Sequence, residues 1–150
     1  MTSVPSLYAF PKSVRLRRSR EFRSTLDLGA KAVGPLMVVF VKRRDEQANG
    51  GVRLGLIASR KVGNSVQRNR IKRHLREAFR QTRSELATWP KLADADLVVI
   101  ARANAVQADS AQIAAGFRHG LKRLAKQLEA RDRAKESAAA ATMEIHGRPC

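Results

Sequence analysis

The sequence is poor in cysteine, in acidic residues and in long apolar runs. Its one cysteine is Cys150, the last residue, so no disulfide can form within the chain. A reducing cytoplasm is therefore the expected location. No apolar run approaches the roughly 18 residues that a membrane span needs. The first residues also lack the basic start and apolar stretch of a signal peptide, so we expect neither secretion nor membrane insertion.

Patterns of catalytic residues are also scarce. The histidines are His74, His119 and His146, and no zinc-ligand spacing or phosphate-binding glycine loop is present. Asp94 and Asp96 fit a turn and the start of a strand better than a pair of catalytic carboxylates. His74 fits the edge of an apolar helix face. We therefore expect no catalytic residue and no metal site on this chain.

Positive charge is what the sequence has in excess. Its 150 residues include 30 Lys and Arg against 13 Asp and Glu, a formal net charge of +17. Most of the surplus falls within residues 11–80, where 19 basic side chains face 5 acidic ones. A chain of this kind repels itself and attracts polyanions, of which nucleic acid is the commonest.

Hydrophobic periodicity and turn residues predict the elements of the first half. A helix is expected over residues 19–28, capped by Ser19 and closed by Gly29 in a left-handed conformation. Strands are expected over 36–41 and 52–59, joined as an antiparallel hairpin through the turn at 49–51. A short extra strand near residues 31–33 is also predicted.

The second half should hold two helices around a buried strand. Asn64 or Ser65 can cap a helix that runs to Thr82 or further. The apolar run 96–102 suits a central strand covered on both faces. A last helix fits 110–128, with Asp109 or Ser110 as its cap and the apolar stripe of Ile113, Phe117, Leu121, Leu124 and Leu128.

These elements predict one α+β domain over residues 15–128. It would be a two-layer sandwich in which helices pack on a small, mostly antiparallel sheet, in the order α-β-β-β-α-β-α. Residues 1–14 read as a loosely ordered lead-in. Residues 129–150 could extend the last helix, but nothing in them demands a core, so we expect a frayed, flexible tail.

The helix that begins near residue 65 is both apolar and basic. At 100° per residue, Ile71, Leu75, Ala78 and Phe79 share one face. The opposite half carries arginines with almost no acid, a pattern that costs self-repulsion unless phosphates lie against it. Guanidinium groups fit phosphate with paired hydrogen bonds. The pattern therefore favours a nucleic-acid partner over a plain solvated face.

The segment SRKVGNSVQRNRIKRHLREAFR resembles the signature of the bacterial ribonuclease P protein component. RLRRSREFRSTLDLG, VRLGLIAS and DLVVIAR are similar to the first helix and the sheet strands of that family. The resemblance implies an unusual left-handed β-α-β crossover, against the general right-handed rule. It also implies an RNA-binding surface made of Arg60, Lys61, Arg68, Asn69, Arg70, Lys72, Arg73 and Arg76, to which the helical pattern adds Arg80.

The resemblance further implies a role in precursor tRNA processing. A family member binds the catalytic RNA subunit of ribonuclease P and the 5′ leader of precursor tRNA, with no obligate protein partner. The RNA subunit carries the active site and most of the Mg²⁺. Phe22 corresponds to an aromatic in the leader-binding cleft, although it could equally be a core residue. Leu26 stands where many members carry a second aromatic.

Other RNA-binding and nucleic-acid functions remain open from the sequence. A ribosomal or other structural RNA-binding protein would share the charge and size. A nuclease acting without RNA would need catalytic residues that the sequence does not display. A DNA-binding helix would need a helix-turn-helix partner, which is missing. Membrane binding is the weakest alternative, because the basic helix needs its apolar face for the core.

Overall fold

The chain folds into an open four-stranded sheet with helices on both faces. The computed structural model of the protein describes residues 14–44, 51–89 and 92–146. The predicted α+β class is confirmed. Of the predicted lead-in, only Val14 lies within the described residues, and its side chain is buried. In chain order the elements are α1 (Ser19–Leu28), β1 (Ala30–Val33), β2 (Met37–Arg43), β3 (Arg53–Ile57), α2 (Ser65–Thr88), β4 (Ala95–Ala101), the 3-10 helix η2 (Ala103–Gln107) and α3 (Ser110–His146).

The sheet has the strand order β1-β2-β4-β3. β2 runs antiparallel to both β1 and β4, whereas β3 runs parallel to β4. The predicted β2–β3 hairpin is therefore wrong, because β4 lies between these two strands. β4 is apolar except for Asp96 and is buried along nearly its whole length, so it needs a neighbour on each side. The short strand expected near residues 31–33 is confirmed as β1.

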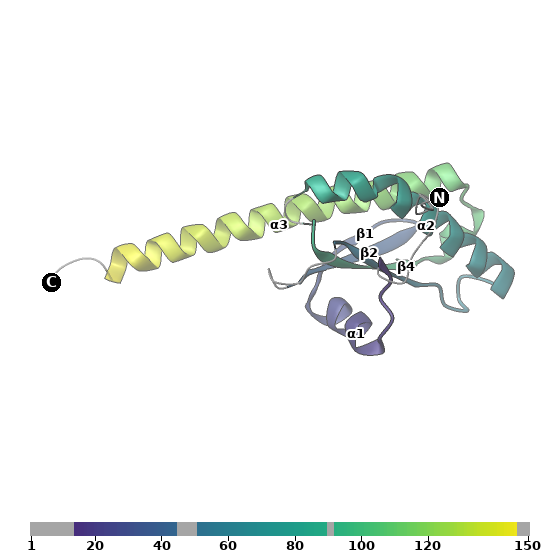
Figure 1. The fold of residues 1–150 in the computed structure, drawn as a ribbon, viewed down its shortest axis with the longest axis horizontal. Coiled ribbons are helices and arrows are strands. Elements are labelled where there is room, and N and C mark those ends of the chain that lie inside the picture. Colours follow the sequence, from purple (N-terminus) through teal and green to yellow (C-terminus); the bar gives the residue numbers. More distant parts are fainter. Residues whose placement is uncertain (1–13, 45–50, 90–91, 147–150) are drawn as a thin grey trace, which may run out of the picture.

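The sheet and the α2–α3 pair form the two main layers of the molecule (Figure 1). α1 lies alone on the other face of the sheet, against β2 and β4. Because side chains alternate between the two faces of a strand, Met37, Val39 and Val41 all point toward α2 and α3, where they are buried. The helices meet them with the largest fully buried side chains, which include Phe79, Phe117, Ile71, Leu75, Leu121 and Leu124.

The start of α2 is fixed by a capping box. The Asn64 side chain accepts a hydrogen bond from the Gln67 backbone N–H, and the Gln67 side chain accepts one from the Asn64 N–H, both at 2.9 Å. Gly63 has a positive φ of 154°, and a Cβ there would lie 2.2 Å from Oε1 of Gln67. The glycine therefore makes room for the cap that orients the basic helix.

The ends of α1 differ from the prediction. Arg18 is the N-cap residue and makes no side-chain cap bond, so Ser19 is the first helical residue instead of the cap. Gly29 is extended, with φ of −78°. It is needed for space, because a Cβ would lie 2.4 Å from the Thr25 carbonyl oxygen and 2.6 Å from that of Val41. α1 therefore turns directly into β1 without a left-handed residue.

α3 begins as predicted but continues much further. Asp109 accepts a hydrogen bond from the Gln112 N–H at 2.8 Å, which confirms it as the cap. Leu128 is the last buried residue of the apolar stripe. The helix nevertheless runs on to His146 and projects from the body (Figure 1), where a frayed tail was expected. Arg43 holds its first projecting turn through a two-bond ion pair with Asp132. Among the described residues no helix is long and apolar enough to cross a membrane.

We expect Asn64→Ala to lower the free energy of unfolding by about 1 kcal/mol, because it removes the side-chain half of the capping box. Urea unfolding followed by circular dichroism measures the change. The control is Ser65→Ala, an exposed neighbour with no hydrogen bond from its side chain among the described residues. Equal losses in the two variants would show that the cap contributes nothing.

Candidate RNA interface

The outward face of α2 carries two rows of polar side chains. Asn69, Arg73 and Arg76 are exposed, and Arg73 and Arg76 form no hydrogen bond or ion pair with any described residue. Arg68 and Lys72, one helical turn apart, are half-buried, and Lys72 lies beside residues of α1 and β3. The helix therefore presents cations in the two directions left free by its apolar face, which confirms the predicted division of α2.

Two of the predicted contact residues already have partners within the protein. Arg70 donates from Nη2 to the backbone carbonyls of Ala108 at 2.7 Å and Val106 at 3.3 Å. Its guanidinium therefore ties α2 to the end of η2 and to the residue that follows it. Arg80 bonds to Glu77, with a distance of 3.0 Å from its Nε. Glu77 neutralises part of the positive charge of Arg80, whereas Arg73 and Arg76 form no ion pair with any described residue.

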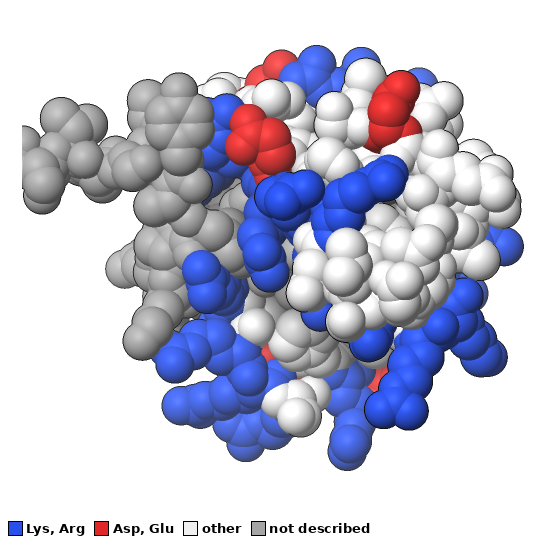
Figure 2. Space-filling view, turned by 90° about the vertical axis from the view of Figure 1, so that its right-hand side faces the viewer, with Lys and Arg blue, Asp and Glu red and all other residues white. Residues whose placement is uncertain are grey.

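The turn before α2 adds two further cations. Arg60 and Lys61 are exposed and lie next to the capped amino end of the helix. Figure 2 shows the side of the molecule that lies at the right of Figure 1. Lys and Arg side chains gather over its lower half, with few acidic side chains among them. Because few acidic side chains neutralise its charge, this surface attracts polyanions.

The charges on α2 also affect the two titratable neighbours that they surround. Partial burial and the positive charges of Arg70 and Arg73 hold the pKa of His74 below its usual value, against a smaller opposing effect of Asp109. The hydrogen bond from Arg80 lowers the pKa of Glu77. His74 is therefore kept neutral more readily than a free histidine, which suits the structural position predicted for it.

A groove of about 520 Å³ lies between α1 and the β3 edge of the sheet. Phe22 and Leu26 of α1 line one wall, and Lys72 of α2 lines the other. The structure therefore places both predicted cleft residues next to a predicted RNA-contacting cation. Ile57 and Ala58 contribute apolar surface from the end of β3.

Gly55 allows the aromatic ring of Phe22 to lie directly on the sheet. A Cβ at Gly55 would lie 2.4 Å from Cε1 and 2.7 Å from Cζ of Phe22. Phe22 is half-buried, so part of its ring packs on the strand and part remains open to the groove. Phe22 therefore both packs against the sheet, as a core residue does, and lines the groove.

An ion network beneath α1 was not predicted from the sequence. Arg53 donates two hydrogen bonds of 2.8 Å to Asp96 and one of 3.3 Å to Glu21 of α1. The bond to Asp96 is the main cause that raises the pKa of Arg53. Arg44 lies 3.4 Å from Asp96 as well. One feature of the sequence could have predicted this network: Asp96 lies near the start of an otherwise apolar strand, and a buried carboxylate needs a cationic partner.

Metal-ligand clusters are absent from the part of the chain that the structure describes. No three His, Cys, Asp or Glu side chains there lie close enough to hold a metal ion. The groove lining includes the carboxylate of Asp27 beside the cations of Arg23 and Lys72. The outward face of α2 presents mainly guanidinium and amide groups. These groups bind phosphates and base edges.

Comparisons with known proteins point to one family. The model of the ribonuclease P family matches residues 10–125. The ribonuclease P protein component of Desulfovibrio desulfuricans is 38% identical over 125 residues, which are 81% of this chain and 90% of the relative. That of Mycolicibacterium vanbaalenii is 43% identical over 90 residues, which are 60% of this chain and 71% of the relative.

Solved structures show the same fold. One is a Staphylococcus aureus RNase P protein mutant described as having defective mRNA degradation activity, with 30% identity and a TM-score of 0.63. The similarity covers 74% of this chain and 87% of that one. A Thermotoga maritima RNase P protein bound to 1-(4-fluorophenyl)-2-thiourea has 26% identity, a TM-score of 0.60 and coverage of 74% and 97%. The chain therefore belongs to the ribonuclease P protein component family.

Proposed function

We propose that this protein binds the catalytic RNA subunit of ribonuclease P and the 5′ leader of precursor tRNA, and so assists removal of the leader. The observation that carries the proposal is the continuity of two surfaces. The cations of α2 lead into the groove between α1 and β3, and Lys72 belongs to both. One protein surface can thereby hold a folded RNA and a single strand beside it.

The proposal assigns the catalytic RNA to the outward face of α2 and the turn before it. Arg60, Lys61, Arg73 and Arg76 are exposed, so they can neutralise phosphates without first losing a partner among the residues that the structure describes. Asn69 lies among them and can bond a base edge or a 2′-hydroxyl. Arg68 and Lys72 extend the cationic surface to the groove. Arg70 and Arg80 contribute more weakly, since each already bonds within the protein.

The leader is assigned to the groove. Phe22 offers part of an aromatic ring for stacking, which is worth about 1–3 kcal/mol per base. Leu26 offers only aliphatic surface, so it contributes contact area without ring stacking. Lys72 supplies a cation for the phosphate backbone of the same strand. A groove of this composition favours single-stranded RNA with little dependence on sequence.

The division of labour places bond cleavage on the RNA subunit. Mg²⁺ bound chiefly by that RNA would supply the activated water and the stabilisation of the leaving oxygen. The protein's own residues neutralise phosphates where two RNAs meet and hold the leader in place. Both effects raise affinity for precursor tRNA and lower the demand for magnesium. The proposal places this assembly in the cytoplasm, without an obligate protein partner.

Reconstitution tests the proposal. The full chain is mixed with a bacterial catalytic RNA, and leader removal is assayed at low magnesium. We expect cleavage that depends on both components and no cleavage of precursor tRNA by the protein alone. The protein-alone arm is needed because a similar Staphylococcus aureus protein is described in terms of mRNA degradation activity. Cleavage without RNA would contradict the proposal.

The identity of the bound RNA distinguishes the proposed function from that of a structural RNA-binding protein. Capture of the full chain from bacterial extract should enrich one RNA of a few hundred nucleotides, the catalytic subunit. Enrichment of ribosomal RNA instead would favour a ribosomal protein.

We expect Arg73→Gln and Arg76→Gln each to weaken binding to the catalytic RNA and to reduce the salt dependence of binding. The slope of log K against log salt should become shallower by roughly 0.7–0.9 per lost phosphate contact. Filter binding across a salt series measures it. Arg131→Gln, an exposed site on the projecting part of α3, is the matched control. The same slope change in the control would remove the assignment to α2.

We expect Phe22→Ala to weaken binding of precursor tRNA to the reconstituted enzyme but not that of mature tRNA. Only the precursor carries a leader to stack on the ring, and loss of one stacked base corresponds to about 1–3 kcal/mol. Phe22→Leu separates ring stacking from packing on Gly55, because it keeps apolar volume over the strand. Equal effects on precursor and mature tRNA would argue that Phe22 serves the fold alone.

A further inference from the structure

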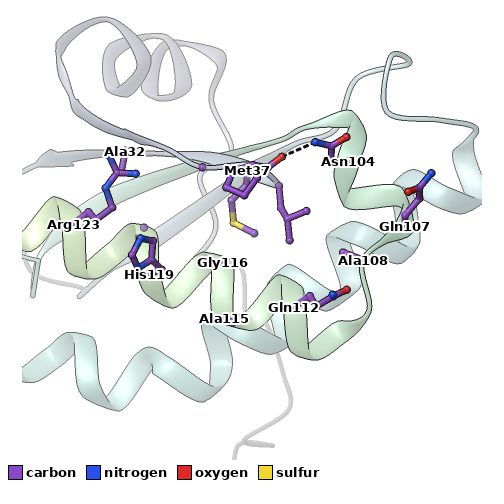
Figure 3. Close-up of a pocket in the computed structure, with 14 residues that line it drawn as sticks. Ala32, Met37, Asn104, Gln107, Ala108, Gln112, Ala115, Gly116, His119 and Arg123 are labelled. Carbon is purple, nitrogen blue, oxygen red and sulfur yellow. Dashed lines mark hydrogen bonds between the residues drawn. The ribbon is translucent and has the colours of Figure 1, made fainter.

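A second cavity lies on the far side of the sheet from α1, at the opposite edge from the groove. It has a volume of about 630 Å³ and lies between α3, the turn after β1 and η2. Cavities of this size accommodate small ligands in many proteins. Figure 3 shows Met37 at its centre and polar side chains around it. We infer that this cavity binds one unpaired nucleotide of the RNA strand that leaves the groove, which we call the distal nucleotide pocket.

The distal nucleotide pocket combines an apolar floor with cationic and amide groups at separate ends. Leu36, Met37 and Ala108 provide the floor, and Met37 and Ala108 are buried. Figure 3 places His119 and Arg123 at one end and the carboxamide side chains at the other. The carboxamides are those of Asn104, Gln107 and Gln112.

This separation matches the parts of a nucleotide. A flat base fits the apolar floor, with the carboxamides positioned to bond its polar edge, as they do in other base contacts. A phosphate fits the guanidinium of Arg123 at the other end. The described residues that line the pocket include neither Asp nor Glu. The chemistry therefore suits an anionic ligand with a neutral, hydrogen-bonding ring.

The carboxamides retain hydrogen-bonding capacity for such a ligand. Within the described part of the chain, Asn104 donates a single long bond, of 3.4 Å, to the Pro35 carbonyl. Gln112 uses its Oε1 to accept from the Asp109 N–H at 3.0 Å, which leaves its amide hydrogens for a ligand. Arg123 donates from Nη1 to the Val33 carbonyl at 2.7 Å. That bond anchors Arg123 beside the pocket and leaves its other nitrogen atoms available.

Two glycines hold α3 close to the strand that forms the floor. A Cβ at Gly120 would lie 2.9 Å from Cγ2 of Val39, and one at Gly116 would lie 3.3 Å from Cε of Met37. Gly116 and Gly120 are one turn apart and both line the pocket. The absence of side chains at these positions keeps the cavity open while the helix packs tightly.

An apolar strip on the α1 face of the sheet links the groove to this pocket. Strand register places Ile57 opposite Ile100, Ile100 opposite Val38, and Val38 opposite Val33. Val33 is 47% exposed, and the other three are half-buried. The strip crosses three strand spacings, about 14 Å, and ends at the turn whose other side lines the pocket. A single strand that leaves the groove along the strip therefore arrives at the pocket.

The inference rests on the proposed function, since it assigns the pocket to a leader already held in the groove. The test uses the full chain reconstituted with the catalytic RNA and precursor tRNAs whose leaders lengthen one nucleotide at a time. We expect the dissociation constant to fall in two steps. The first step comes when the leader fills the groove, and the second when it reaches the distal nucleotide pocket.

Two pocket variants should remove the second step. Gln112→Glu replaces the amide donor with a carboxylate oxygen, while still accepting the capping bond from Asp109. Arg123→Gln removes the guanidinium. Each should weaken binding of the longest-leader precursor by about tenfold and leave short-leader binding unchanged. Lys122→Gln, an exposed site on α3 outside the pocket, makes the same change in net charge and should keep both steps.

The outcomes separate the inference from the proposed function. A second step that persists in both pocket variants, or that Lys122→Gln also removes, would overturn the inference alone. Absence of the first step in the unaltered protein would contradict the proposed leader binding. Thermal unfolding checks that each variant is folded, and Gln112→Glu decides the question if Arg123→Gln is unstable. Inorganic phosphate that shifts the amide resonances of Asn104 and Gln112 as strongly as adenosine monophosphate would overturn base recognition.

Discussion

The apolar contact of α2 with the sheet and α3 determines where the charges of this chain can lie. Ile71, Leu75 and Phe79 are each about 1% exposed, and burying side chains of this kind contributes about 1.5–3 kcal/mol each. A helix held by one face cannot rotate without exposing them. Arg73 and Arg76 are therefore fixed outward, and Lys72 is fixed toward the groove. Packing of the apolar face of α2 thus fixes the positions of cations that repel one another.

The position of α1 depends on a different kind of contact. Arg53 forms ion pairs with Asp96 of the central strand and with Glu21 of α1. These ion pairs fix the distance between the amino-terminal turn of α1 and the sheet. Phe22 rests on Gly55 nearby. Removing one member of a half-buried network leaves its partners uncompensated, which is more costly than the loss of an exposed pair. These contacts fix α1 on the sheet, and α1 carries Phe22 and Leu26, which line the groove.

The sequence was most informative where the pattern was local and long. The two faces of α2, its cap at Asn64 and the apolar stripe of α3 all follow from side-chain periodicity and capping chemistry, and the structure confirms them. Strand pairing was predicted less well. The turn residues 49–51 favoured a β2–β3 hairpin, but the fully apolar 97–100 requires neighbours on both sides. That requirement involves the whole sheet, so local turn chemistry could not reveal it.

The site was predicted in the same uneven way. The resemblance and the helical pattern located the cations, Phe22 and Leu26, and the structure brings Lys72 to the same groove as the last two. Periodicity could not show that Arg70 bonds to the carbonyls of Val106 and Ala108, since these partners are 36 and 38 residues away in sequence. It also could not show that α3 continues past Leu128, because exposed alanines and mixed charges are compatible with both helix and coil.

The central claim is that the outward face of α2 holds the catalytic RNA while its inward face holds the core. Site-specific photo-crosslinking tests it most directly, with a crosslinker at position 76 on α2 and another at position 126 on α3, both exposed. In the reconstituted complex, position 76 should crosslink to the catalytic RNA and position 126 should not. Crosslinks from position 126 with none from position 76 would contradict the account.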